Sequence, residues 1–297
     1  MNISGFGMDT ITLAGPLEAK LEAMQQAGFT QVMLKANDLV GHPQGLDAAV
    51  RLVRDSGLRG TGFQVLRDFE GLSGHLHDYK VDIAKAMLQM CSALGCKVLL
   101  ACSSTSTHAT QDLDHIARDL RKLAMLALPL GIKVAFEGLS WGRTINEFTT
   151  AWDVVGRADC PNLGLGIDSY HIFAAKTALD EIDYLDPSKI FLVQLADFMG
   201  QETKSFEERM ATARTFRVFP GEGVHSEALS ELVLKLDRLG YQGDYSFEVF
   251  NEDYVNLPLP VVCERARRSA VWLSEDVLRR STPRPNAMRL KAAALPG

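Results

Sequence analysis

The chain has 297 residues, of which 46% are apolar and 23% are charged, and its formal net charge is −6. This composition suits a soluble globular protein with one large core, and closed α/β barrels reach this length as one unit. The net negative charge and the scattered basic residues predict no nucleic-acid-binding surface. No segment is long, apolar and uncharged enough to predict a membrane span.

Eight short apolar runs along the chain are typical of buried strands. In chain order they cover residues 3–8, 31–35, 60–65, 97–101, 133–137, 163–168, 190–196 and 244–249. Between them, apolar residues recur three and four positions apart, the period of amphipathic helices. The predicted helices cover residues 17–27, 46–56, 83–94, 113–128, 145–157, 226–239 and 261–278.

Five of the predicted helices end in a glycine that comes just before the next strand. These glycines are Gly28, Gly57, Gly95, Gly131 and Gly240. Glycine closes a helix in the left-handed conformation at little steric cost. The repeated unit of helix, glycine and strand predicts parallel strands joined by crossovers, and eight such units favour a closed (β/α)8 barrel of the α/β class. The alternative, an open doubly wound sheet, would require a glycine-rich phosphate loop after the first strand, which the sequence lacks there.

Two segments depart from the repeat. The connection 197–224 is much longer than an ordinary strand-to-helix loop, and connections of that length are usually functional or disordered. Residues 281–297 contain three prolines and no firm apolar period. We therefore expect one barrel domain over residues 1–280 and a flexible tail or linker over residues 281–297.

The chain has five cysteines, an odd number with no CxxC pair. Cysteines in apolar surroundings usually serve as small core residues. We expect them to be reduced, in a cytoplasmic protein without a signal peptide. The sequence leaves the oligomeric state open and allows a homo-oligomer.

Four consecutive predicted strands deliver an oxygen ligand to the same rim of the barrel. Glu137 and Asp168 end the fifth and sixth strands, Gln194 lies near the end of the seventh, and Glu248 near the end of the eighth. Active sites of such barrels lie at the carboxyl ends of the strands. An all-oxygen set suits one divalent ion such as Mg²⁺, Mn²⁺ or Co²⁺ better than zinc. The alternative for each acidic residue is a helix cap or an ion-pair partner, but burying several carboxylates without a cation is costly.

Three further residues are candidates for work on a substrate. His171 follows Asp168 by three residues, a position suited to a general base above the metal, although it could instead cap the next helix. Arg67 follows the third strand, and Arg217 lies in the long connection. A guanidinium pairs well with a carboxylate, so these arginines indicate a small anionic substrate. The alternative for Arg67 is pairing with its acidic neighbours Asp68 and Glu70.

Several segments resemble a known family. They are LRDFEG (66–71), ACSSTSTHATQDL (101–113), FEGLSWGR (136–143), LGIDSYHIFA (165–174), FLVQLADF (191–198), RVFPGEGVHS (217–226) and FEVFN (247–251). The pattern is similar to the xylose isomerase-like barrels, the sugar phosphate isomerase/epimerase group. Within that group it most resembles the bacterial 3-dehydroshikimate dehydratases.

The resemblance implies that Glu137, Asp168, Gln194 and Glu248 bind the metal. It also implies that His171 is the base and that Arg67 and Arg217 contact the substrate. The implied reaction is the dehydration of 3-dehydroshikimate, an anionic cyclic ketone, to protocatechuate by enolisation and loss of water. The same equipment would serve a metal-dependent sugar or keto-acid isomerase or epimerase, and a barrel that binds ligand without turnover is a third possibility.

Two features depart from the family pattern. The second strand ends in Lys35 and Ala36, where a glutamate is expected in such barrels, so its contacts to substrate are open. Some members carry a C-terminal domain resembling a dioxygenase, which leaves open whether residues 281–297 are a tail or the start of a linker.

Overall fold

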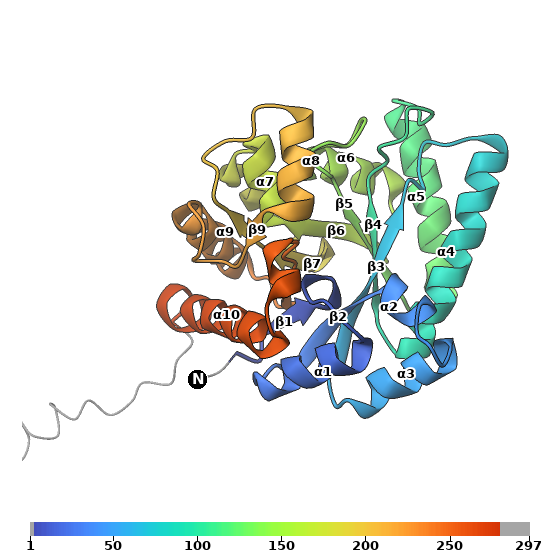
Figure 1. Cartoon of the computed structure of the whole chain (residues 1–297). Coiled ribbons are helices and arrows are strands. Elements are labelled where there is room, and N and C mark those ends of the chain that lie inside the picture. The colour runs from blue at the N-terminus through green and yellow to red at the C-terminus, as the bar shows by residue number, and fades with distance from the viewer. Residues whose placement is uncertain (1–2, 280–297) are drawn as a thin grey trace, which may run out of the picture.

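A computed structural model describes residues 3–279 of the chain, and the expected tail, 281–297, lies outside the described residues. Eight parallel strands form a closed barrel in the order β1-β10-β7-β6-β5-β4-β3-β2, which confirms the predicted (β/α)8 fold (Figure 1). The strands are β1 Phe6–Asp9, β2 Gln31–Lys35, β3 Arg59–Arg67, β4 Val98–Cys102, β5 Lys133–Glu137, β6 Leu163–Asp168, β7 Ile190–Leu195 and β10 Tyr245–Phe247. Most are buried on both faces, which explains their nearly continuous apolar sequences.

Helices surround the barrel, as Figure 1 shows. They are α1 Leu17–Gln26, α2 Ala36–Val40, α3 Leu46–Asp55, α4 Gly74–Leu94, α5 Leu113–Ala127, α6 Phe148–Ala158, α7 Ser169–Ala175, α8 Phe206–Thr215, α9 Ser226–Leu239 and α10 Leu259–Val271. The start predicted for α4, residue 83, was wrong because its first two turns bury only His77 and Val81, too few apolar positions for a helical period. The short α2 and α7 were missed because each has only one or two turns.

The predicted helix-closing glycines adopt the expected conformation. Their φ angles are 89° at Gly28, 73° at Gly57, 75° at Gly95, 64° at Gly131 and 98° at Gly240. A side chain at these positions would be strained, so each helix ends where the next strand must begin.

The long connection between β7 and α9 is ordered. It contains β8 (Asp197–Phe198) and β9 (Arg217–Val218), which pair antiparallel, with α8 between them. The Tyr170 hydroxyl of α7 donates to the Arg209 carbonyl of α8, and Arg209 Nη1 donates to the Ser140 carbonyl at 3.3 Å. These contacts hold α8 beside the loop that follows β5, at the carboxyl rim of the barrel.

All five cysteines are buried free thiols, as the sequence predicted. Within residues 3–279, no helix combines the length and the apolar character that a membrane span requires.

Glu70 joins the loops that follow β3 and β4. Its side chain is 2% exposed, and Oε1 accepts a hydrogen bond from the Ser104 backbone N–H at 2.5 Å. The other oxygen, Oε2, is buried and has no hydrogen-bond partner. Burial raises the pKa of Glu70 from 4.5 to about 8. The native state therefore holds this proton more tightly than the unfolded chain does.

This pKa predicts a pH-dependent effect of Glu70→Gln. The native chain has more protons bound than the unfolded chain between pH 4.5 and about 8, so Glu70 lowers the free energy of unfolding as the pH rises through that range. Glutamine keeps the acceptor oxygen and removes the titration. The free energy of unfolding of the variant, relative to that of the wild type, should therefore rise with pH. The rise should reach up to about 1.4 kcal/mol for each unit by which folding raises the pKa of Glu70.

Urea unfolding at pH 5 and pH 8.5 would measure the difference in free energy of unfolding between Glu70→Gln and the wild type. The exposed Glu231→Gln is the matched control. A difference in free energy of unfolding between Glu70→Gln and the wild type that is the same at both pH values would contradict the prediction.

Candidate active site

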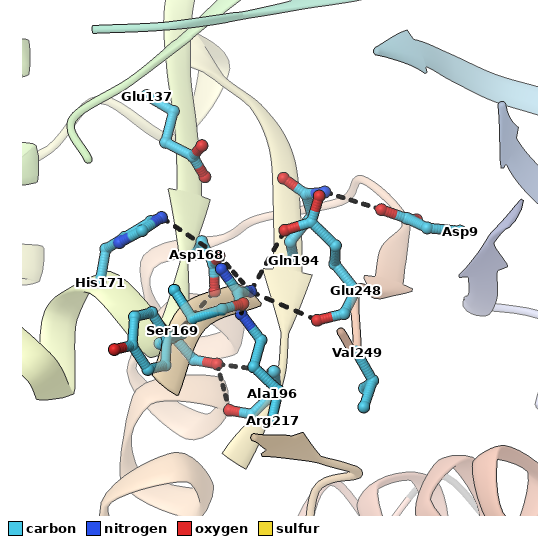
Figure 2. Close-up of polar contacts among 12 residues, drawn as sticks. Asp9, Glu137, Asp168, Ser169, His171, Gln194, Ala196, Arg217, Glu248 and Val249 are labelled. Atoms are coloured by element: carbon cyan, nitrogen blue, oxygen red, sulfur yellow. Dashed lines mark hydrogen bonds and ion pairs between the residues drawn. The ribbon is translucent and has the colours of Figure 1, made fainter. Parts of the chain in front are cut away.

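The four predicted metal ligands converge at the carboxyl rim. Asp168 and Gln194 are register partners on β6 and β7, Glu137 ends β5, and Glu248 directly follows β10. Their exposed fractions are 3% for Glu137, 2% for Asp168, 0% for Gln194 and 7% for Glu248. Figure 2 shows that their side chains point toward a common space.

The cluster concentrates negative charge away from water. Burial, together with the charges of Asp168 and Glu248, raises the pKa of Glu137 well above its usual range. Burial also raises the pKa of Glu248 to about 7. Carboxylates in such a place require a nearby cation or a bound proton, because isolated buried charge is strongly disfavoured.

Arg217 supplies one cation to the cluster. Its Nη1 donates to Asp168 Oδ2 at 2.7 Å and to Glu248 Oε2 at 3.1 Å, and its side chain is 2% exposed. The guanidinium also lies over the Tyr170 ring, 4.6 Å from the centroid. Asp168 caps α7 as well, because its Oδ1 accepts from the Tyr170 backbone N–H at 2.8 Å. Both structural roles weighed for Asp168 from the sequence, a helix cap and an ion pair, are therefore present within the cluster.

The donor atoms fit a divalent ion. Glu137 Oε1 and Gln194 Oε1 are buried acceptors with no hydrogen-bond partner. Ligand atoms of Glu137, Asp168 and His171 lie within 4.8 Å of one another. Unsatisfied buried oxygens are rare in proteins, and a hard cation would satisfy both of them.

His171 borders the cluster from the first turn of α7. Its Nε2 lies 3.6 Å from Asp168 Oδ2, and its Nδ1 lies 3.1 Å from Ser140 Oγ and accepts a hydrogen bond from the Ser140 backbone N–H at 3.2 Å. The ring packs edge-on against Trp141 and Tyr170. Burial lowers the pKa of His171 to about 3, so the imidazole is neutral at physiological pH.

A pocket of about 260 Å³ opens beside these residues, and it is lined by Glu137, His171, Arg217, Glu248 and by Arg67, Trp141 and Arg214. Arg67 does not pair with Asp68 or Glu70, the alternative considered from the sequence. Within residues 3–279 it has no ion-pair partner, because Asp68 instead accepts from Thr105 and contacts Lys80. The pocket therefore presents a free guanidinium next to the carboxylate cluster.

Sequence reasoning missed two residues at this site, Asp9 and Arg214. Asp9 ends β1, and its carboxylate accepts a hydrogen bond from Gln194 Nε2 at 2.7 Å. The rule that selected the other acids, a carboxylate at a strand end, would have found it had the first strand been extended by one residue. Arg214 lines the pocket from α8, a helix whose single buried residue, Ala213, gives no amphipathic signal.

The fold and the site together define the class of the protein. The sequence model of the xylose isomerase-like TIM barrel family matches residues 21–275. The chain belongs to this family, which confirms the family resemblance found in the sequence.

Individual relatives are more specific. The chain is 34% identical to the 3-dehydroshikimate dehydratase of Pseudomonas aeruginosa over 92% of its own length and 43% of that protein. It is 31% identical to the enzyme of the same name from Pseudomonas putida, over 90% of this chain and 41% of that one. A solved xylose isomerase-like TIM barrel/4-hydroxyphenylpyruvate dioxygenase fusion protein superimposes with a TM-score of 0.86 at 30% identity, covering 96% of this chain and 45% of that one. The chain thus spans less than half the length of these relatives.

The ion pairs of Arg217 predict a large stability effect in metal-free protein. Arg217→Met would leave Asp168 and Glu248 buried without their cation, and breaking a buried pair in this way costs about 3–5 kcal/mol. Urea unfolding after chelator treatment should show a loss of that size. Arg214→Met is the control, because Arg214 has no ion pair among the described residues and should change stability little. Equal stability of the two variants would show that Arg217 does not balance the cluster.

Proposed function

We propose that the chain catalyses the dehydration of 3-dehydroshikimate to protocatechuate with the help of one divalent metal ion. The observation that carries the proposal is the buried oxygen cluster next to a neutral histidine, in a pocket with a free arginine. The two Pseudomonas relatives named for this activity support the choice of substrate. The geometry by itself supports a wider class, enzymes that remove a proton beside a carbonyl group.

Glu137, Asp168, Gln194 and Glu248 would hold the ion, which in this proposal is Mg²⁺, Mn²⁺ or Co²⁺. The two unpartnered oxygens, Glu137 Oε1 and Gln194 Oε1, support this assignment. When bound, such an ion supplies electrostatic stabilisation of the negative charge that develops on a substrate carbonyl oxygen.

His171 acts as the general base in this proposal. Its Nδ1 accepts a hydrogen bond from the Ser140 backbone N–H and lies 3.1 Å from Ser140 Oγ, and these contacts fix the orientation of the ring. His171 would take a proton from the carbon next to the ketone and return it to the departing hydroxyl group, which leaves as water. One molecule of water is lost, and the ring that remains becomes aromatic through tautomerisation.

Arg67 and Arg217 are the proposed contacts for the substrate carboxylate. Arg67 lines the pocket without an ion pair of its own among the described residues, and Arg217 lines it while balancing Asp168 and Glu248. A fixed carboxylate would determine which carbon of the ring faces His171. Helix α8, which contributes Arg214 to the pocket wall, would keep water from the reacting carbon.

The proposal is tested with chelator-treated protein mixed with 3-dehydroshikimate. Without added metal the rate should fall to background, and Mg²⁺, Mn²⁺ or Co²⁺ should restore the rise of protocatechuate absorbance in the ultraviolet. No aromatic product from folded protein with any of these ions would overturn the dehydratase proposal. Reversible interconversion of ketoses in a substrate panel would then support the isomerase alternative.

The role of His171 is tested with His171→Asn. Loss of a general base typically costs about 10²–10⁴-fold in rate, so kcat should fall in that range. Because His171 also lies among the candidate ligand atoms, Mn²⁺ affinity must be measured on the same variant. A base predicts unchanged affinity, whereas a ligand predicts weaker binding. The exposed His75→Asn serves as the control, and a near wild-type rate in His171→Asn would remove this residue from the mechanism.

A further inference from the structure

Asp9 lies beside the oxygen cluster, at the end of β1, and is fully buried. Its Oδ2 accepts hydrogen bonds from two amide nitrogens, Gln194 Nε2 at 2.7 Å and Gln64 Nε2 at 3.1 Å. Its Oδ1 accepts from the hydroxyl of Ser246, the register partner of Gln194 on β10. Four strands, β1, β3, β7 and β10, thus contribute one side chain each to a single hydrogen-bond network.

This network determines which way the Gln194 amide points. The Gln194 nitrogen donates to Asp9 Oδ2 and lies 3.2 Å from Gln64 Oε1, a second acceptor. Turning the amide over would place its oxygen against these two oxygens and lose both hydrogen bonds. The observed orientation leaves Gln194 Oε1 buried without a partner. Figure 2 shows Gln194 reaching toward Asp9 with its nitrogen.

Asp9 also controls the second acceptor. Gln64 could present either its nitrogen or its oxygen to Gln194, but its nitrogen is already committed to Asp9. Its oxygen therefore faces Gln194. Asp9 thus accepts hydrogen bonds from both amides, and the hydroxyl of Ser246 donates to the same carboxylate. Glu248 also contacts the Gln194 amide.

We propose that Asp9 is a positioning residue of the metal centre, which orients the Gln194 amide so that Oε1 is presented to the divalent ion. The inference rests on the proposed function only in that Gln194 is a metal ligand. An amide ligand has a single good donor oxygen, so without Asp9 the free amide would divide its time between two orientations. Partners of metal ligands typically contribute about 10–100-fold to metal affinity.

The first test measures Mn²⁺ affinity by competition with a chelating dye. Asp9→Ala should bind Mn²⁺ about 10–100-fold more weakly than the wild type. The matched control is Asn162→Ala, which removes buried hydrogen bonds to Ala124 and Ile132 away from the site. The control should unfold at a lower temperature but bind Mn²⁺ within about twofold of the wild type, because general destabilisation does not change the ligand set.

The second test separates amide orientation from other effects of Asp9. In a Gln194→Glu background both side-chain oxygens are donors to metal, so orientation no longer matters. Asp9→Ala should then strengthen Mn²⁺ binding, because it removes a carboxylate that faces the new glutamate. A loss of affinity of the same size in both backgrounds would overturn the proposal.

The outcomes distinguish this inference from the proposed function. If the wild type and Asp9→Ala bind Mn²⁺ equally, the inference fails and the metal centre stands. If the folded wild type binds no divalent ion, the proposed metal centre fails and the inference fails with it. If Asp9→Ala does not fold, Asp9→Asn replaces it, since asparagine keeps one acceptor oxygen and should show a smaller loss in the same direction.

Discussion

The architecture of the rim depends on electrostatic repulsion between buried carboxylates. Glu137, Asp168 and Glu248 meet where three strands of the barrel end, and Asp9 lies beside them at the end of a fourth strand. Burial raises the pKa of Asp9, like that of Glu137, well above its usual range. Such a group is stable only with a positive charge among its members or with protons bound, and folding alone gains nothing by assembling it. The position of Arg217, the conformation of the connection that carries it and the fit to a divalent ion all follow from this requirement.

The sequence predicted the barrel because its strands are buried on both faces and its helices end at glycines in the left-handed conformation. It predicted Glu137, Asp168, Gln194 and Glu248 as neighbours because parallel strands in a barrel end at one rim. These inferences depend on chain direction and periodicity, which are local properties of the sequence. Helix α8 was not predicted, since a helix that buries only Ala213 has no apolar face to reveal it.

Side-chain partners were beyond the sequence for a different physical reason. Arg217 lies 49 positions from Asp168 and 31 from Glu248, so their contact depends on how the long connection folds back over the barrel. The orientation of Gln194 likewise depends on Asp9, 185 positions away. Periodicity shows which residues are buried and leaves open which polar atoms meet. The partners and orientations of the amide and guanidinium groups in the site therefore come from the structure and not from the sequence.

The attachment of Arg217 also bears on the dynamics of the rim. The Arg217 backbone N–H donates to the Phe250 carbonyl at 3.0 Å, and Asn251 Nδ2 donates to the Arg217 carbonyl at 2.8 Å, so the β9 segment is bonded to the loop after β10. Detaching this segment would withdraw the guanidinium and leave two carboxylates facing each other out of water. The electrostatic cost of that step raises the free energy of local unfolding of the β9 segment. The long connection that carries Arg217 is in this way held against the barrel by its ion pairs with the carboxylate cluster.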